Sequence, residues 1–218
     1  MIRFENLTKR FVLHGQSKMV MKDVNLTIPS RTSVALLGRN GAGKSTLLRM
    51  IAGTMDITSG RILSTGSISW PVGFAGSFHR DLTGSQNTKF IARVYGVDTD
   101  ALTDFVEDFA ELGKHFRLPL RSYSSGMKSR LAFGVSMGIG FDTYLVDEVT
   151  SVGDAAFRSK ATKVFNARMA KAGAIVVSHS MPQIRQMCDS AMILEGGQAY
   201  YFEDLEEAIA LHESHMTR

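Results

Sequence analysis

One stretch constrains the chain more than any other: Gly38-Arg39-Asn40-Gly41-Ala42-Gly43-Lys44-Ser45-Thr46. It follows an apolar, β-prone run at residues 33–37 and precedes a helical pattern at residues 47–52, so the order is strand, glycine loop and helix. The glycines allow successive backbone N–H groups to point inward, and the helix that begins at Lys44 adds the positive end of its dipole. This order predicts a phosphate-binding loop, or P-loop.

The end of the loop carries the side chains that we expect to act on a nucleotide. The Lys44 ammonium can reach the β- and γ-phosphates, and the Ser45 hydroxyl is placed to bind Mg²⁺. The alternative is a glycine-rich turn that carries a lysine by chance, and the flanking strand and helix disfavour it. The other predicted nucleotide contacts are Gly38, Asn40, Gly41, Ala42, Gly43 and Thr46.

The composition is ordinary for a globular protein. The chain has 218 residues, of which 44% are hydrophobic and 21% charged, so we expect a single large domain or one domain with a lobe. A net charge of +4 without any Lys/Arg block does not establish a nucleic-acid surface. The sequence has neither the roughly 20 consecutive apolar residues of a membrane-spanning helix nor a signal peptide pattern. Any membrane role is therefore expected to come through a partner.

Two alternating segments near the N-terminus, residues 2–13 and 21–28, predict strands. Phe11 lies in the first of them, and it is our candidate for a ring that stacks on adenine. The alternative is that Phe11 is only a core or edge aromatic.

Later strands end in further candidate catalytic residues. The apolar strand at residues 143–146 is followed by Asp147, which is expected to hold hydrated Mg²⁺, and by Glu148, which is expected to polarise the attacking water. A buried strand at residues 173–178 ends at His179, which could contact the γ-phosphate. Solvated strand-end acids and a structural histidine are the alternatives.

A mainly helical insertion is predicted at about residues 72–140, inside an α/β core formed by about 1–71 and 141–218. The C-terminal region offers fewer candidates. Cys188 is the only cysteine, and its place near a helix end favours a partly buried structural thiol. For His212 and His215 we expect a solvated tail rather than a metal pair.

The segment Ser122-Tyr123-Ser124-Ser125-Gly126-Met127 resembles the signature loop of ABC ATPases. Ser124, Ser125 and Gly126, with the start of the following helix, would offer a hydroxyl, backbone N–H groups and a dipole to a phosphate. A generic Ser/Gly helix cap is the alternative. The resemblance extends along the chain in order: Phe11 matches the adenine-stacking aromatic, Gly38–Thr46 the Walker A motif, Asp147 the Walker B aspartate, Glu148 the catalytic glutamate, His179 the switch histidine and Asp154 the D-loop aspartate.

The resemblance implies a P-loop nucleotide-binding domain with a RecA-like core, an N-terminal antiparallel β subdomain and an inserted α-helical subdomain. It implies ATP and Mg²⁺ as cofactors, and a head-to-tail homodimer that holds each ATP between the Walker A motif of one copy and the signature loop of the other. It also implies a separate membrane permease as partner, at the cytoplasmic face of the bacterial inner membrane.

Several segments narrow the resemblance to ATP-binding subunits of bacterial polysaccharide exporters: Trp70-Pro71-Val72-Gly73, Leu82-Thr83-Gly84 and Asp147 to Asp154. Capsular polysaccharide exporters fit best, while O-antigen and teichoic acid exporters share much of the pattern. O-antigen versions often carry a C-terminal carbohydrate-binding domain, for which a chain that ends at residue 218 has no room.

Two departures from the family pattern concern coupling. The usual glutamine after the Trp70 strand is absent, with His79 only a candidate substitute, and the signature loop lacks its second glycine and its glutamine. We expect the permease to dock near residues 72–97. Other function classes fit less well. Fused cassettes or a long coiled-coil insertion would favour a soluble ABC ATPase that acts on nucleic acid or ribosomes, and an Asn-Lys-X-Asp motif would favour a GTPase. The chain has none of these, and a P-loop kinase leaves the signature-like loop unexplained.

Overall fold

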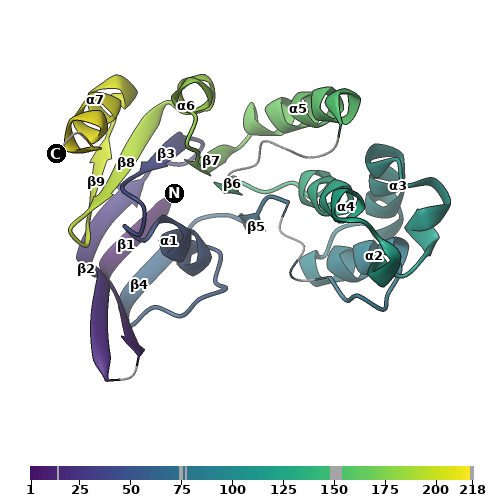
Figure 1. Cartoon of the computed structure of the whole chain (residues 1–218), viewed down its shortest axis with the longest axis horizontal. Helices are drawn as coiled ribbons and strands as arrows, with labels where there is room; N and C mark the ends of the chain where they lie inside the picture. Colours follow the sequence, from purple (N-terminus) through teal and green to yellow (C-terminus); the bar gives the residue numbers. More distant parts are fainter. Residues whose placement is uncertain (14, 74–75, 77, 148–153, 217–218) are drawn as a thin grey trace. The chain divides into compact units, whose positions relative to one another are not determined.

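The computed structural model describes residues 1–13, 15–73, 76, 78–147 and 154–216 (Figure 1). The chain divides into two compact units. The first consists of Met1–Pro71, Phe141–Glu148 and Lys171–Arg218, and the second of Val72–Gly140 and Val149–Ala170.

The first unit begins with a three-stranded antiparallel sheet in the order β2 (Gln16–Ile28), β1 (Ile2–Leu13) and β4 (Ser59–Ser64). Along β1 the side chains of Ile2 and Phe4 are buried and that of Arg3 is exposed. This alternation is typical of a sheet with one face on a core and the other toward solvent.

A six-stranded sheet forms the centre of the first unit. Its order is β5 (Ile68–Pro71), β6 (Thr143–Asp147), β7 (Gly173–Val177), β3 (Ser33–Leu37), β8 (Ser190–Glu195) and β9 (Gln198–Phe202). The first five strands are parallel, and β9 is antiparallel to β8. Every residue of β3 and β7 is buried, which explains why their sequences are apolar apart from Ser33. The carboxyl ends of β3, β6 and β7 meet at one edge of the sheet, where Asp147 ends β6, the P-loop follows β3 and His179 follows β7.

Three helices complete the first unit: α1 (Lys44–Ile51), α6 (Met181–Met187) and α7 (Leu205–Met216). Leu47 and Leu48 of α1 are fully buried, in one core with Phe4 of the first sheet and Leu36 of the second. The helix that follows the P-loop therefore joins the two sheets. α7 lies beside β8 and β9 (Figure 1).

The second unit contains α2 (Gly84–Tyr95), α3 (Thr99–Ala110), α4 (Ser125–Gly138), α5 (Ala155–Met169) and two 3₁₀ turns, Gly113–Arg117 and Leu120–Ser122. Its core is aromatic, because the ring of Phe109 packs against those of Phe105, Phe133 and Phe157 at centroid distances of 5.8, 5.8 and 5.2 Å. Among the described residues, every helix is too short or too polar to cross a bilayer.

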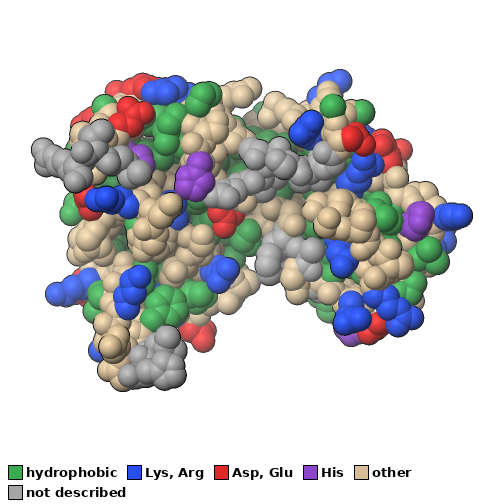
Figure 2. All heavy atoms as spheres, in the orientation of Figure 1, with side chains coloured by type: hydrophobic (Ala, Val, Ile, Leu, Met, Phe, Trp, Pro, Cys, Tyr) green, Lys and Arg blue, Asp and Glu red, His purple; other side chains and the backbone are tan. Residues whose placement is uncertain are grey.

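The expected fold class, an α/β domain with an N-terminal antiparallel sheet and a mainly helical part, is confirmed. One segment differs from the expected boundaries. The expected core range of 141–218 includes α5, yet α5 belongs to the second unit. The reason is packing, since Phe157 of α5 contacts the aromatic core of that unit and Lys160 bonds Glu111 at 2.9 Å. Figure 2 shows acidic and basic side chains interspersed over the described part of the face drawn, in keeping with a net charge of only +4.

Candidate nucleotide site

The P-loop adopts a conformation that its glycines make possible. Gly38, Gly41 and Gly43 have φ angles of 149°, 81° and 108°, in the region that side chains disfavour. Space is restricted as well, because a Cβ at Gly38 would lie 2.7 Å from the Leu194 carbonyl oxygen, and one at Gly43 would lie 2.5 Å from Cγ1 of Val20. Close packing on β2 and β8 thus adds a second reason for glycine at two of the three positions.

The Lys44 ammonium lies against the loop itself. It donates hydrogen bonds to the carbonyl oxygens of Gly38 at 2.6 Å and Arg39 at 3.2 Å. α1 begins at this lysine without a side-chain cap and without an acidic residue in its first turn. Uncapped N–H groups and a positive helix end favour an anion at this position.

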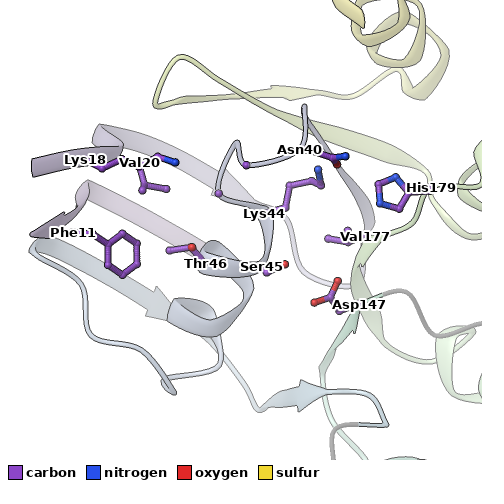
Figure 3. A pocket seen from close by; sticks show the side chains of 12 residues that line it. Phe11, Lys18, Val20, Asn40, Lys44, Ser45, Thr46, Asp147, Val177 and His179 are labelled. Atoms are coloured by element: carbon purple, nitrogen blue, oxygen red, sulfur yellow. The ribbon is translucent and has the colours of Figure 1, made fainter. Parts of the chain in front are cut away.

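A pocket of about 320 Å³ opens beside the loop. Figure 3 shows Phe11 at one end, and Lys44, Ser45, Asp147 and His179 gathered toward the other. The pocket is thus elongated, with an aromatic ring at one end and polar groups at the other. Its lining is Phe11, Lys18, Val20, Asn40, Gly41, Gly43, Lys44, Ser45, Thr46, Asp147, Val177 and His179.

The structure brings together most of the residues predicted for this site. Phe11, the Lys44–Ser45 pair, Asp147 and His179 come from four separate parts of the sequence, and all of them line the same pocket. Phe11 is 38% exposed, so its ring is not a core aromatic. The predicted catalytic Glu148, and 151–153 of the predicted D-loop, lie outside the described residues.

Oxygen ligands for a small hard cation are present in this pocket. The Ser45 hydroxyl and the Asp147 carboxylate both line it, and Mg²⁺ prefers such ligands. Within the described ranges no group of three or more His, Cys, Asp or Glu side chains could hold a metal by itself. Mg²⁺ commonly completes its coordination with waters and substrate phosphates, so the donor set fits a metal that arrives with a nucleotide.

The signature-like loop lies in the second unit and opens α4. The Ser124 hydroxyl caps this helix by accepting a hydrogen bond from the Met127 N–H at 3.2 Å. Ser124, Ser125 and Gly126 are all exposed. The local structure is thus a capped helix start with an accessible Ser-Ser-Gly segment.

Asp154 has partners within the chain. One carboxylate oxygen accepts the Phe157 N–H at 3.0 Å, and the other pairs with Arg130 at 2.7 Å. The Phe157 N–H, assisted by the Arg130 charge, holds the pKa of Asp154 below its ordinary value. His79 has a local role too, because its Nδ1 accepts the Asp81 N–H at 3.3 Å in the turn before α2.

Lys18 and Val20 line the pocket, and the sequence analysis missed both. Lys18 pairs with Phe11 across β1 and β2. The sequence feature that could have indicated Lys18 is the short connection between the two strands, because a tight hairpin fixes which residues lie opposite one another. The expected strand at 21–28 began too late to include this pair.

The C-terminal histidines are not in a solvated tail, and this expectation was wrong. His212 is only 8% exposed, and the His215 Nδ1 lies 3.0 Å from a carboxylate oxygen of Glu195. They belong to the inner stripe of α7, with Ala208 and Ile209, at the spacing that places residues on one helix face. Cys188 was expected to be a partly buried thiol, and the structure confirms that it is buried: it is 7% exposed, and burial raises its pKa to about 12.

Comparisons with known proteins identify the family. The sequence model of the ABC transporter family matches residues 21–151. The chain is 48% identical over 212 residues to the polysialic acid transport ATP-binding protein KpsT of Escherichia coli, with 96% of this chain and 95% of the relative covered. It is 44% identical to the capsule polysaccharide export ATP-binding protein CtrD of Neisseria meningitidis serogroup B, with 98% and 99% covered.

The solved structure of a dimeric bacterial ABC transporter cassette, MJ0796, has the same fold, with a TM-score of 0.72, 19% identity, and 94% of this chain and 99% of that chain covered. The chain is therefore an ATPase of the ABC transporter family, in the group of the capsule polysaccharide export ATP-binding proteins.

Proposed function

We propose that this protein is the ATP-hydrolysing motor subunit of a bacterial capsular polysaccharide exporter, acting through a separate membrane permease. One observation carries the hydrolytic part: a single pocket contains the P-loop, Asp147 and His179, with Phe11 at its far end. The cargo class is supported by relatives named for capsule export at 44% and 43% identity. A relative named for O-antigen export, at 33%, supports the second candidate cargo.

The length of the pocket suits an extended nucleotide. Adenine stacks on Phe11, and the triphosphate lies along the P-loop toward Asp147 and His179. Phosphate oxygens there replace the Gly38 and Arg39 carbonyls as partners of the Lys44 ammonium, because a charged acceptor forms a stronger hydrogen bond than a neutral one. Ser45 and Asp147 would hold Mg²⁺, which would neutralise part of the charge on the phosphates.

Hydrolysis is an in-line displacement at the γ-phosphorus. Water attacks, the bond between the γ-phosphorus and the bridging oxygen breaks, and ADP leaves. Glu148 follows the last residue of β6, and it polarises the water and accepts its proton. His179 donates a hydrogen bond to a γ-phosphate oxygen, where it positions the transferred group.

Two assembly steps complete the proposal. Ser124, Ser125 and Gly126 bind the nucleotide of a second copy in a head-to-tail homodimer, which gives this exposed loop a ligand. The permease docks near residues 72–97, where α2 exposes Phe90, Val94 and Tyr95 at 53%, 60% and 42%. Large exposed apolar side chains grouped on one helix are typical of an interaction surface. Docking there holds the protein at the cytoplasmic face of the inner membrane.

The test compares wild type with Glu148→Gln, and uses Glu203→Gln as a matched control because Glu203 is exposed on the chain outside the pocket. ATP hydrolysis and ATP-dependent dimerisation are measured with and without a co-purified capsular permease. We expect Glu148→Gln to lower hydrolysis by at least about 100-fold, a general-base effect, and to accumulate an ATP-bound dimer, while the control behaves as wild type.

Normal hydrolysis by Glu148→Gln would rule out the assigned mechanism. To separate the two cargo classes, the same assay is repeated with an O-antigen permease. Stimulation by the capsular permease alone supports the first candidate, and stimulation by the O-antigen permease alone supports the second.

A further inference from the structure

A second cavity of about 240 Å³ lies against the P-loop. Asn40 and Gly41 line both this cavity and the nucleotide pocket, so the loop is a thin wall between them. The other wall of the second cavity comes from the end of β8 and from α7. Its lining is Gly38, Arg39, Asn40, Gly41, Ala42, Ile193, Leu194, Glu195, Gly196, His212 and His215.

α7 is held in place at both of its ends. Near its start, Glu206 receives two hydrogen bonds from the Arg185 guanidinium, at 2.8 and 3.0 Å. In its last turn, His215 pairs with Glu195 at 3.0 Å. The helix between these contacts keeps His212 buried beside the P-loop, at 8% exposure.

The His212 side chain is only 8% exposed, and it lines this cavity. Burial and, next, the positive charge of Lys44 hold its pKa below the ordinary value, so the ring is neutral at neutral pH. His215 acts in the same direction, while Glu213 and Glu195 oppose it. Arg39 also lines the cavity. Among the described residues, the His and Glu side chains around this cavity do not form a group that could hold a metal ion.

We propose that His212 is a proton-linked residue behind the P-loop: its neutral ring faces the loop across the second cavity, and it takes up a proton from solvent when a nucleotide binds in front. The inference rests on the proposed nucleotide site. Its physical basis is the shared wall. A phosphate chain beside Lys44 brings negative charge that offsets the lysine, and a positive imidazole behind the loop then costs less. Because linkage is reciprocal, protonated His212 must in turn favour bound nucleotide.

The test is a histidine NMR titration of wild-type protein, with and without ADP. We expect ADP to raise the His212 titration midpoint by about 0.5 to 1.5 pH units, a typical size for one nearby charge in a partly screened site. His115 is the internal control, since it lies in the second unit outside both cavities. His212→Gln assigns the resonance, and backbone-correlated assignment replaces the variant should it fail to fold.

Affinity gives a second readout that a purely structural role would not change. As pH falls from 8 through the two His212 midpoints, the ratio of ADP affinity in wild type to that in His212→Gln should rise toward a limit of about 3- to 30-fold, the linkage counterpart of that shift. His115→Gln serves as the matched variant, and the ratio of wild type to His115→Gln should stay flat.

The outcomes separate this inference from the proposed function. If ADP binds but leaves the His212 midpoint unchanged or lowers it, the inference is wrong and the nucleotide site stands. If ADP does not bind at all, the proposed function fails first.

Discussion

Arg130 of α4 and Asp154 at the start of α5 form an ion pair of 2.7 Å. The guanidinium also lies over the ring of Phe157, 4.5 Å from its centroid, while the other oxygen of Asp154 caps α5. One arginine thus joins the helix that follows the Ser-Ser-Gly loop to the helix that follows the predicted D-loop. Both helices belong to the second unit, so the pair stabilises that unit from within.

This relationship predicts an order of thermal stability. Asp154→Asn keeps a good helix cap but loses the charge, whereas Asp154→Ala loses both. We expect the Tm to fall in the order wild type, Asn, Ala, with a loss of about 2–4 °C for Ala. Asp104→Asn, at an exposed position of α3, is the control. Because the folded pKa of Asp154 is lowered, its contribution is present above about pH 4 and disappears as pH falls through that lowered pKa. Equal Tm values at pH 7 would contradict the prediction.

Gly43 should tolerate no side chain. In Gly43→Ala the new Cβ would meet Val20, and the φ of 108° adds backbone strain. We expect the Tm to fall by about 4 °C or more and ATP affinity to fall at least about tenfold, measured by calorimetry. Gly53→Ala is the control, since its φ is also positive but its added Cβ would meet nothing within 4 Å. Adding Val20→Ala to Gly43→Ala should recover part of the loss, because it removes the clash and leaves the strain.

Phe11 should contribute to affinity through its ring. Stacking of a base on an aromatic side chain is worth about 1–3 kcal/mol, so Phe11→Ala should raise the Kd for ATP about 5- to 150-fold, and Phe11→Trp should preserve it. Val12→Ala is a matched control, because Val12 is 64% exposed on the next position of β1 and does not line the pocket. An unchanged Kd in Phe11→Ala would leave Phe11 as an edge aromatic only.

Cys188 should resist thiol reagents in the folded protein. With a pKa raised to about 12, its thiolate fraction at pH 8 is on the order of 10⁻⁴, and its sulfur is buried. We expect alkylation by iodoacetamide to be at least about 1,000-fold slower in native than in denatured protein. As the only cysteine, it makes the rate easy to measure by mass. Rapid labelling of native protein would show that this region opens.

The exposed apolar face of α2 should bind the permease. Replacing Phe90 and Val94 together by serine should reduce co-purification of the capsular permease by about tenfold or more, the effect expected when large apolar anchors are removed from an interface. Tyr200→Ser is the control, because Tyr200 is 52% exposed on β9 in the first unit. Thermal unfolding of both variants verifies that they fold. If co-purification is not reduced, the permease binds a different surface of the protein.

The sequence alone determined the features that depend on local order. Strand, glycine loop and helix succeed one another within residues 33–52, so the P-loop and the role of Lys44 followed from neighbours in the chain. Buried parallel strands have mostly apolar sequences, which predicted β3, β6 and β7 and placed Asp147 and His179 at the ends of β6 and β7.

Only the tertiary structure decided features that depend on distant pairing. Phe11 joined the pocket because β2 folds back on β1, and α5 joined the second unit because Phe157 meets Phe109. In the sequence, His212 resembles part of a polar tail, because the sequence does not show whether another surface covers that face of the helix. α7 packs beside β8, and that contact places a buried histidine behind the P-loop, about 170 residues away along the chain.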